Sequence, residues 1–322
     1  MRYTIPLASE LVDELIPFWA SIFGDELPDI NRQLLLGAEE AYSHITLYLR
    51  RESGQLAGTS LIMQSLSLPA LAGLGEVASD PRRRGQGIAT ELCAQAIEEF
   101  RAAGGEACFL GTVNPAAARI YHRLGWRKLA GANVMVNITC GASPEEFLVD
   151  YFRRPGAVTV GRAGPDVRVA MIPLILTPHD GKVLDTNIGL YSCRYVVQNS
   201  CMGLYPRYMR HLKQAHEAFF AARTEDARVV GLATAWFDSQ DRCQVDGFVH
   251  RNFAETWGDL LKAACQWGRE KGAVSLQALA LMEDEEKQTL FEELGFIREG
   301  MGQNFSVDGR SVGTWQMIAQ MA

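Results

Sequence analysis

Apolar positions follow two different periods along the first 140 residues. Residues 3–7, 44–51, 56–66, 73–79 and 107–113 alternate or form short apolar runs, and they predict strands, with a final strand at 126–137. Residues 11–23, 30–40, 85–103 and 115–124 have apolar residues at helical spacing, and Gly104 and Gly105 are expected to end the third helix. This mixture of strands and helices predicts an α+β (mixed α/β) architecture.

The second half of the chain repeats the pattern of the first. EDARVVGLATAW resembles SGQLAGTSLIMQ, CQVDGFV resembles GLGEVAS, and LFEELGF resembles IYHRLGW. Phe291 follows Tyr121 by 291 − 121 = 170 positions, and Val249 follows Ser79 by 249 − 79 = 170. A constant offset predicts two copies of one fold. A Pro/Gly-rich stretch places a linker at 143–165, between a first domain at 1–142 and a second at 166–322.

Composition narrows the class of protein. The chain has 322 residues, of which 48% are hydrophobic and 21% charged, with a formal net charge of -7. This balance is typical of a globular protein with two domains, and the acidic excess argues against a general nucleic-acid binder. Acidic residues near the N-terminus are unlike a signal peptide, and no apolar run is long enough to span a bilayer, so we expect neither secretion nor membrane insertion. Seven cysteines without a C-x-x-C pair favour reduced thiols, a cytoplasmic location and no metal site.

One turn combines positive charge with backbone freedom. SDPRRRGQGIATEL, residues 79–92, places three arginines and two glycines immediately before a predicted helix. The start of a helix has unpaired N–H groups and a partial positive charge, and glycines allow a ligand to approach the backbone, so a phosphate group is the expected ligand. The P-loop pattern is absent, and Thr90 stands where the dinucleotide-binding fingerprint needs its third glycine.

Two motifs of this sequence resemble one family. RGQGIA, residues 84–89, is similar to the Q/R-x-x-G-x-G/A signature of the GNAT superfamily of acyl-CoA-dependent N-acetyltransferases, and NPAAARIYHRLGW, residues 114–126, resembles the superfamily's later N-x-x-A-x-x-x-Y-x-x-x-G-F/W motif. The resemblance covers the first 140 residues. It implies two tandem GNAT-like domains, each with a mostly antiparallel central sheet flanked by helices, and acetyl-CoA as the cofactor.

The resemblance also implies which residues bind the cofactor. The turn is expected to hold the pyrophosphate of coenzyme A, and the backbone N–H groups of a splayed strand are expected to polarise the thioester. The turn residues are Arg84, Gly85, Gln86, Gly87, Ile88, Ala89 and Thr90, and the strand residues are Val77, Ala78 and Ser79. Asn114 is expected to contact the pantetheine arm, to cap the following helix, or to do both.

Two residues are candidates for proton transfer. Tyr121 occupies the family's tyrosine position, where the hydroxyl protonates the leaving thiolate as a general acid, although a packed amphipathic tyrosine is the alternative. Strand alternation places Glu76 on the same side as Leu74 and Ala78, which makes it the best candidate for a general base. A solvated carboxylate, or one that only orients a cationic substrate, explains Glu76 equally well.

The second half lacks the counterparts of this site. At the 170-residue offset, Arg84, Gly85, Gly87 and Ala89 correspond to Ala254, Glu255, Trp257 and Asp259, Asn114 corresponds to Asp284, and Tyr121 to Phe291. Carboxylates and a tryptophan at the turn predict that the second copy has lost its coenzyme site. Asp246 corresponds to Glu76 at the same offset, and it is the one site position at which the second half keeps a comparable acidic residue.

The resemblance therefore implies an acetyltransferase that moves acetyl from acetyl-CoA to a primary amine by direct attack in a ternary complex. The expected partner is a small-molecule amine, with no nucleic acid and no membrane, and the chain is expected to be a monomer (a pseudo-dimer) or a homodimer. A non-catalytic acyl-CoA sensor or scaffold is one alternative, and a protein N-terminus or lysine acetyltransferase is another. The resemblance places the aromatic-rich segment 187–212 near the acceptor, although core packing is the more ordinary role of its tyrosines.

Overall fold

The chain folds into two compact units. A computed structural model describes residues 1–24, 32–211, 217–238 and 240–320. The first unit contains Met1–Val149, Arg168–Ile172 and Gln198–Pro206, and the second contains Asp150–Val167, Pro173–Val197 and Arg207–Ala322. Two seven-stranded sheets with flanking helices confirm the predicted mixed α/β class. The predicted domain limits stay a prediction, and the segment expected as a linker contains helix α5 (Pro144–Arg153) and strand β8 (Val158–Arg162).

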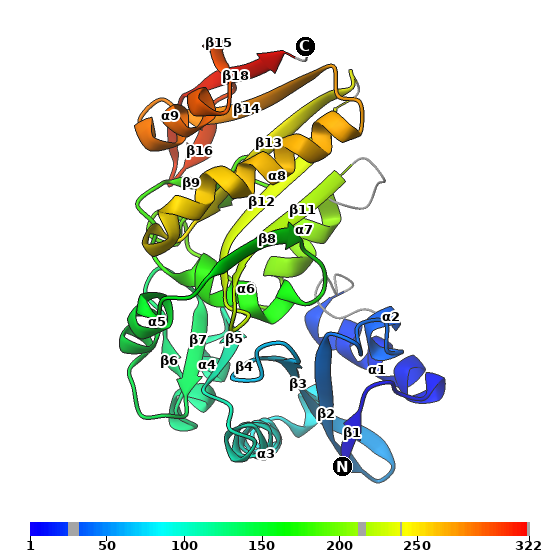
Figure 1. Ribbon diagram of the computed structural model, residues 1–322. Helices are drawn as coiled ribbons and strands as arrows, with labels where there is room; N and C mark the ends of the chain where they lie inside the picture. The colour runs from blue at the N-terminus through cyan, green and yellow to red at the C-terminus, as the bar shows by residue number, and fades with distance from the viewer. Residues whose placement is uncertain (25–31, 212–216, 239, 321–322) are drawn as a thin grey trace. The chain divides into compact units, whose positions relative to one another are not determined.

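The sheet of the first unit has one parallel pair of strands (Figure 1). In spatial order its strands are β1 (Arg2–Thr4), β2 (Ser43–Glu52), β3 (Gln55–Ser65), β4 (Leu71–Ser79), β5 (Ala107–Gly111), β7 (Val134–Ile138) and β6 (Arg127–Lys128). Strands β4 and β5 are parallel, so a crossover must join them, and the short helix η1 (Pro81–Arg83) and helix α3 (Ile88–Ala102) form it. The single strand predicted at 126–137 is instead β6 and β7, because the chain turns at Gly131, where φ is 70°.

Helices cover both faces of this sheet. The core cluster joins Leu92 and Cys93 of α3 to Leu74 of β4, and it includes Tyr121 of α4 (Pro115–Arg123). Helix α1 (Ser9–Phe23) contacts the other face, where the indole of Trp19 donates to the hydroxyl of Thr59, 2.9 Å away. The glycines after α3 end the helix as predicted, with Gly104 N–H bonded to the carbonyl of Arg101.

Two predicted helices are shorter in the structure. Helix α3 begins at Ile88 rather than at 85, because Gly85 and Gly87 both have φ of 81°, which no right-handed helix continues. Of the helix predicted at 30–40, residues 30 and 31 lie outside the described residues, and α2 covers only Arg32–Leu35 before a turn at Gly37.

The second unit repeats this topology. Its strands run in the order β8, β11 (Glu217–Thr224), β12 (Val229–Phe237), β13 (Arg242–Val249), β14 (Ser275–Leu281), β18 (Thr314–Gln320) and β15 (Ile297–Met301). Its parallel pair is again the fourth and fifth strand, joined by η2 (Arg251–Thr256) and α8 (Trp257–Glu270), and α9 (Glu285–Glu293) follows as α4 does in the first unit. The repeat read from the sequence is therefore a repeat of the fold.

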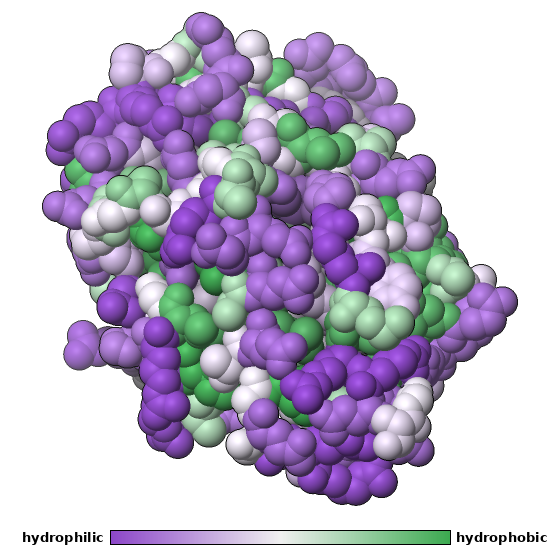
Figure 2. All heavy atoms as spheres, turned by 90° about the horizontal axis from the view of Figure 1, so that it is seen from below, coloured by the Kyte–Doolittle hydropathy of each residue, from purple (hydrophilic) through white to green (hydrophobic). Residues whose placement is uncertain are grey.

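Among the described residues, two helices and two short strands stand between β8 and β11, where α1 and α2 stand between β1 and β2, and a short hairpin stands between β15 and β18. They are α6 (Val167–Leu176), β9 (Val183–Asp185), β10 (Leu190–Tyr191), α7 (Leu204–His211), and the hairpin of β16 (Phe305–Val307) and β17 (Arg310–Val312). On the face seen in Figure 2, polar residues predominate and apolar residues form small separate areas. Across the described residues, every helix is too short or too polar to cross a bilayer.

Candidate active site

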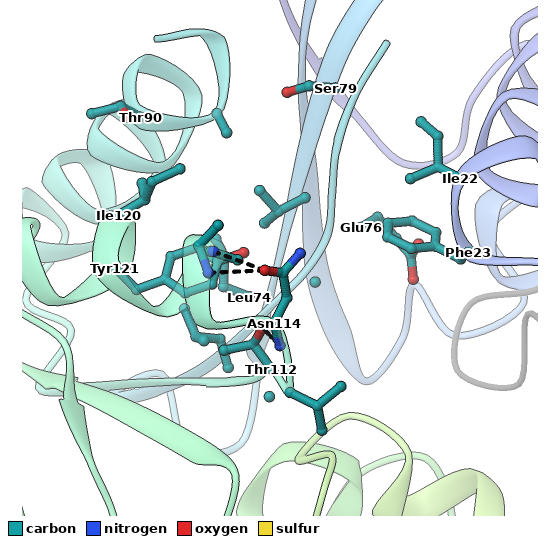
Figure 3. A pocket seen from close by; sticks show the side chains of 18 of the residues that line it. Ile22, Phe23, Leu74, Glu76, Ser79, Thr90, Thr112, Asn114, Ile120 and Tyr121 are labelled. Atoms are coloured by element: carbon teal, nitrogen blue, oxygen red, sulfur yellow. Dashed lines mark hydrogen bonds between the residues drawn. The ribbon is translucent and has the colours of Figure 1, made fainter. Parts of the chain in front are cut away.

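A cavity of 1170 Å³ opens in the first unit where β4 and β5 separate (Figure 3). The two strands pair only from Leu71 to Gly73 and from Ala107 to Phe109. Beyond Gly73, β4 continues to Ser79 without a register partner in β5, within the part of the chain that the structure describes. The parting strands, the start of α3 and one side of α4 line the cavity.

A β-bulge shapes β4 at the edge of this cavity. Gly75 pairs with Leu61 and Ala78 pairs with Thr59, so two residues of β4, Glu76 and Val77, face the single residue Ser60. Glu76 has φ of 50°, a left-handed conformation that is uncommon for a residue with a side chain. An extra residue on one strand re-aims the side chains that follow it.

Buried hydrogen bonds hold the bulge in place. The indole N–H of Trp19 donates to the hydroxyl of Thr59 over 2.9 Å, and that hydroxyl donates to the carbonyl oxygen of Glu76 over 2.7 Å. Trp19 and Thr59 are both fully buried. Helix α1 thus fixes the backbone of Glu76 through one threonine.

The bulge overturns the alternation argument for Glu76. Leu74 pairs with Ile62 and faces α3, whereas Ala78 pairs with Thr59 and faces α1, so Leu74 and Ala78 do not share a side as predicted. In Figure 3, Glu76 lies beside Phe23 of α1, and Leu74 lies near Tyr121. The extra residue breaks the period of two on which the prediction relied.

The start of α3 forms the basic end of the cavity. Gly87 precedes the helix in a left-handed conformation, and no side chain caps the first turn. A Cβ added to Gly85 or to Gly87 would meet open space, so these glycines serve the backbone conformation and leave the approach to the helix start clear. Unpaired N–H groups at this point attract an anion.

The arginines of the turn differ in their partners. Arg82 is bonded to Asp80, and these hydrogen bonds hold the pKa of Asp80 at about 2. Arg83 pairs with Glu52. Among the residues that the structure describes, no carboxylate is within ion-pair distance of Arg84, which lines the cavity together with Arg83 and Arg123. Arg84 is therefore the turn arginine best placed to receive an anionic ligand.

Tyr121 lines the cavity from α4. Its ring packs at 6.1 Å from that of Trp126, whose indole donates to the carbonyl of Cys108. Burial raises the pKa of the Tyr121 phenol, so the hydroxyl keeps its proton at neutral pH. Asn114 caps α4, as predicted, by accepting from the N–H of Ala116 at 2.9 Å.

The structure brings most of the predicted site residues together. All of those predicted in this unit line the cavity except Ala78, which is buried beneath it, and Gln86, which is exposed on the turn. Further lining residues that the sequence did not indicate include Ile22, Phe23, Arg123, Asn199 and Met202. The position of Arg123 could have been predicted from the sequence, because its spacing from Ala116 and Ile120 places all three residues on one side of α4. The roles of these residues stay predictions.

The corresponding region of the second unit is different. Helix α8 begins at Trp257 without a left-handed turn, and the cavity at its start is about 100 Å³, lined by residues of 178–184 as well as by Asp284 and Glu286. Phe291 stands at the place of Tyr121, with its ring inclined by 58° to that of Phe296, as Tyr121 is inclined by 59° to Trp126.

Asp246 is not the counterpart of Glu76. In β12 and β13, Gly231 pairs with Val249 as Gly58 pairs with Ser79, but no bulge follows, so Asp246 stands at the position of Gly75. It is fully buried, and it is bonded to Lys287 at 2.8 Å and to the N–H and hydroxyl of Thr186. Asp246 therefore belongs to a buried polar network and does not face a cleft.

In the part of the chain that the structure describes, no group of three or more histidine, cysteine and acidic side chains is positioned to hold a metal ion. Burial raises the pKa of Cys93 to about 12, so its thiol stays protonated.

Comparison with known proteins assigns the first unit. A family model described as an acetyltransferase (GNAT) domain matches residues 4–129. A mutant form of the spermidine N-acetyltransferase SpeG from Vibrio cholerae is 14% identical over 51% of this chain and 93% of the other, with a TM-score of 0.41. A GNAT-family acetyltransferase from Streptococcus pneumoniae is 14% identical over 52% and 100%, with a TM-score of 0.40. No curated protein matches the sequence. The match of the family model alone identifies residues 4–129 as an acetyltransferase (GNAT) domain, the family that the two motifs predicted.

Proposed function

We propose that the first unit transfers an acetyl group from acetyl-CoA to a primary amine by direct attack in a ternary complex. The observation that carries this proposal is the distribution of charge in one cavity. Arg83, Arg84 and Arg123 line it together with the uncapped start of α3, and Glu76 lines it from the bulge beside Phe23. An anionic cofactor and a cationic acceptor therefore have separate places in the same cavity.

The residues of the basic end fit coenzyme A. The glycine turn leaves the N–H groups at the start of α3 accessible to a pyrophosphate, and Arg84 adds a charge-assisted contact. Leu110, Ala117 and Ile120 give the middle of the cavity an apolar wall suited to a pantetheine arm. Acetyl-CoA, when bound, supplies the thioester whose acetyl group is transferred.

Two side chains of the cavity can move protons. Glu76 can take one proton from the acceptor ammonium, which leaves the amine neutral and nucleophilic. As the C–N bond forms and the C–S bond breaks, the Tyr121 hydroxyl, whose proton is retained at neutral pH, can give that proton to the departing thiolate, and the second proton that the nitrogen loses restores the phenol. The backbone N–H groups of β4 beyond Gly73, which have no partner strand in β5, can stabilise negative charge on the carbonyl oxygen.

The proposal assigns coenzyme binding to the domain predicted at 1–142 and none to the domain predicted at 166–322. Trp257 and Glu255 at the start of α8 provide bulk and negative charge where the first unit has glycine, and they support this division.

Calorimetry with acetyl-CoA tests the proposal. Gly87→Glu should abolish binding, because it places a carboxylate where the pyrophosphate would bind. Gly104→Glu is the matched control, since Gly104 follows the opposite end of the same helix with φ of 83° and equally open space. Both variants carry the same backbone strain, so a difference between them reports the anion site. Equal binding by the two variants would refute the assignment of the turn.

A thiol-release assay on the full chain tests the chemistry. Wild-type protein should release coenzyme A from acetyl-CoA at a rate that depends on the concentration of an added primary amine. Tight binding of acetyl-CoA without amine-dependent thiol release would instead identify a non-catalytic acyl-CoA sensor.

A further inference from the structure

A segment far along the sequence lies directly on the strands that form the site. Residues 199–202 contact β4 and β5 at three glycines. A Cβ at Gly73 would come within 2.0 Å of the sulfur of Met202, and a Cβ at Gly111 within 2.9 Å of the carbonyl oxygen of Asn199. A Cβ at Gly75 would lie 3.9 Å from the Cγ of Met202, which is an ordinary van der Waals contact. The absence of side chains at Gly73 and Gly111 is what allows the segment to approach.

This segment is fixed to the first unit by hydrogen bonds. The N–H of Asn133 donates to the carbonyl of Gln198 at 2.7 Å, and the Asn133 side chain donates to that of Asn199 at 2.8 Å. A few residues later, the guanidinium of Arg168 lies 4.4 Å from the ring centroid of Tyr205, and Arg168 is paired with Glu39. The segment is therefore a fixed part of the cavity wall.

The segment covers the face of the sheet opposite the coenzyme helices. Ala72 and Leu74 of β4 point into the core beneath α3, so the intervening Gly73 faces the other way, toward the side that α1 covers. Met202 packs there, and it lines the same cavity as Phe23 and Glu76. An acceptor that approaches the thioester from this side meets Met202 before it meets β4.

We propose that residues 199–202 form the acceptor wall of the cavity and that Met202 sets the size of the amine that is accepted. In Figure 3, the apolar side chains of Ile22 and Phe23 lie on the same side as Glu76. Met202 lines the same cavity and packs on Gly73. This combination suits a small free amine, with its ammonium beside Glu76 and a compact apolar skeleton against Met202. The inference rests on the proposed acetyl transfer.

Steady-state kinetics of the full chain with n-propylamine and 2-phenylethylamine test this inference. Met202→Ala should raise the ratio of kcat/KM for 2-phenylethylamine over n-propylamine about 10-fold, because a hydrophobic pocket discriminates skeleton size by roughly that factor per group. Met202→Leu keeps the volume and should stay within about twofold of the wild type. Met209→Ala, at a methionine that is 37% exposed, is the matched control and should leave the ratio unchanged.

The affinity for acetyl-CoA, measured by calorimetry, reports whether each variant keeps its fold and its coenzyme site. An unchanged amine ratio in Met202→Ala with full acetyl-CoA affinity would overturn this inference and leave the proposed function intact. Loss of acetyl-CoA affinity in both Met202 variants would also overturn it, since the segment would then serve the coenzyme side. Turnover with spermidine or a lysine peptide, but with neither test amine, would refute the substrate class. A wild-type protein that acetylates none of these amines would refute the proposed function itself.

Discussion

Replacing Thr59 by valine should weaken both the fold of the first unit and its chemistry. Valine has nearly the shape of threonine but no hydroxyl, so the change removes the link between α1 and the bulge. The fully buried indole N–H of Trp19 would lose its acceptor, and the carbonyl of the half-buried Glu76 would lose the Thr59 donor. Glu76 would then be free to leave its left-handed conformation.

The magnitude follows mainly from the buried indole N–H of Trp19, which loses the Thr59 hydroxyl as its acceptor. A buried donor without a partner costs about 1–3 kcal/mol. Valine avoids burying the hydroxyl itself, and relaxation of the bulge would offset part of the loss, so we expect the free energy of unfolding to fall by about 1–2 kcal/mol. Most domains have about 5–15 kcal/mol in total, so the variant should still fold at 25 °C.

The effect on catalysis should exceed the effect on coenzyme binding. A shift of about 1 Å in a group that acts on the acceptor can cost about 100-fold, so kcat/KM for the amine should fall between about 10-fold and 100-fold. The affinity for acetyl-CoA should change little, because the turn at Gly85 and Gly87 lies beyond the bulge and does not use the Thr59 hydroxyl.

Urea denaturation, amine-dependent thiol release and calorimetry measure these three quantities. Thr59→Ser is the control, since it keeps the hydroxyl and loses only a methyl group, and it should retain most of the wild-type kcat/KM. If Thr59→Val unfolded at the same urea concentration as the wild type and turned over at the same rate, the relay from Trp19 to Glu76 would have no role in positioning the site.

Three further substitutions test the chemistry of the first unit and the buried polar network of the second. Tyr121→Phe should lower kcat by about 100-fold through loss of the general acid, with the acetyl-CoA affinity from calorimetry unchanged; an unchanged kcat would remove Tyr121 from the mechanism. Asp246→Asn leaves the buried ammonium of Lys287 without its charge partner and should lower the urea stability of the second unit by about 3–5 kcal/mol, so an unshifted unfolding midpoint would contradict the role of this pair. Burial and the neighbouring Asp246 raise the pKa of Asp185 to about 7. Because this carboxyl holds its proton more tightly in the folded state, its contribution to the free energy of unfolding is fully present below about pH 4 and is lost as the pH rises through 7. Asp185→Asn should abolish that fall in a series of urea titrations from pH 4 to 8, and an identical pH dependence in variant and wild type would exclude Asp185 as its source.

Local patterns in the sequence carry the information that proved predictable. The turn at Gly85 and Gly87 could be located because the helix start, the glycines and the arginines are adjacent in the chain. Tyr121 belongs to one short helix that Asn114 caps, so helical geometry fixes where Tyr121 lies relative to the cap. The repeat was visible because corresponding elements keep a nearly constant separation.

Features that depend on distant contacts were not predictable in this way. The bulge at Glu76 depends on Thr59 and Trp19, which lie 17 and 57 positions earlier in the chain, and nothing in the local alternation of β4 indicates an extra residue. The contact of Met202 with Gly73 joins segments about 130 residues apart, so the glycine could not be explained before the structure brought the two together. Register and packing decide such details, and local propensity does not encode them.

Comparison of the two units distinguishes the features that the shared fold requires from the features found only at the site of the first unit. Both units have the same strand order and the same single parallel pair, so this topology does not depend on the features in which they differ. The second unit has Leu232 in place of Thr59, and its strands pair there without a bulge. It has Trp257 in place of Gly87, so its helix starts without a left-handed turn. Phe291 stands in place of Tyr121. A strained residue at Glu76 costs free energy and persists only where its surroundings hold it. Since the same fold forms without the bulge, the turn or the phenol, the presence of all three around one cavity is better explained by a ligand than by folding.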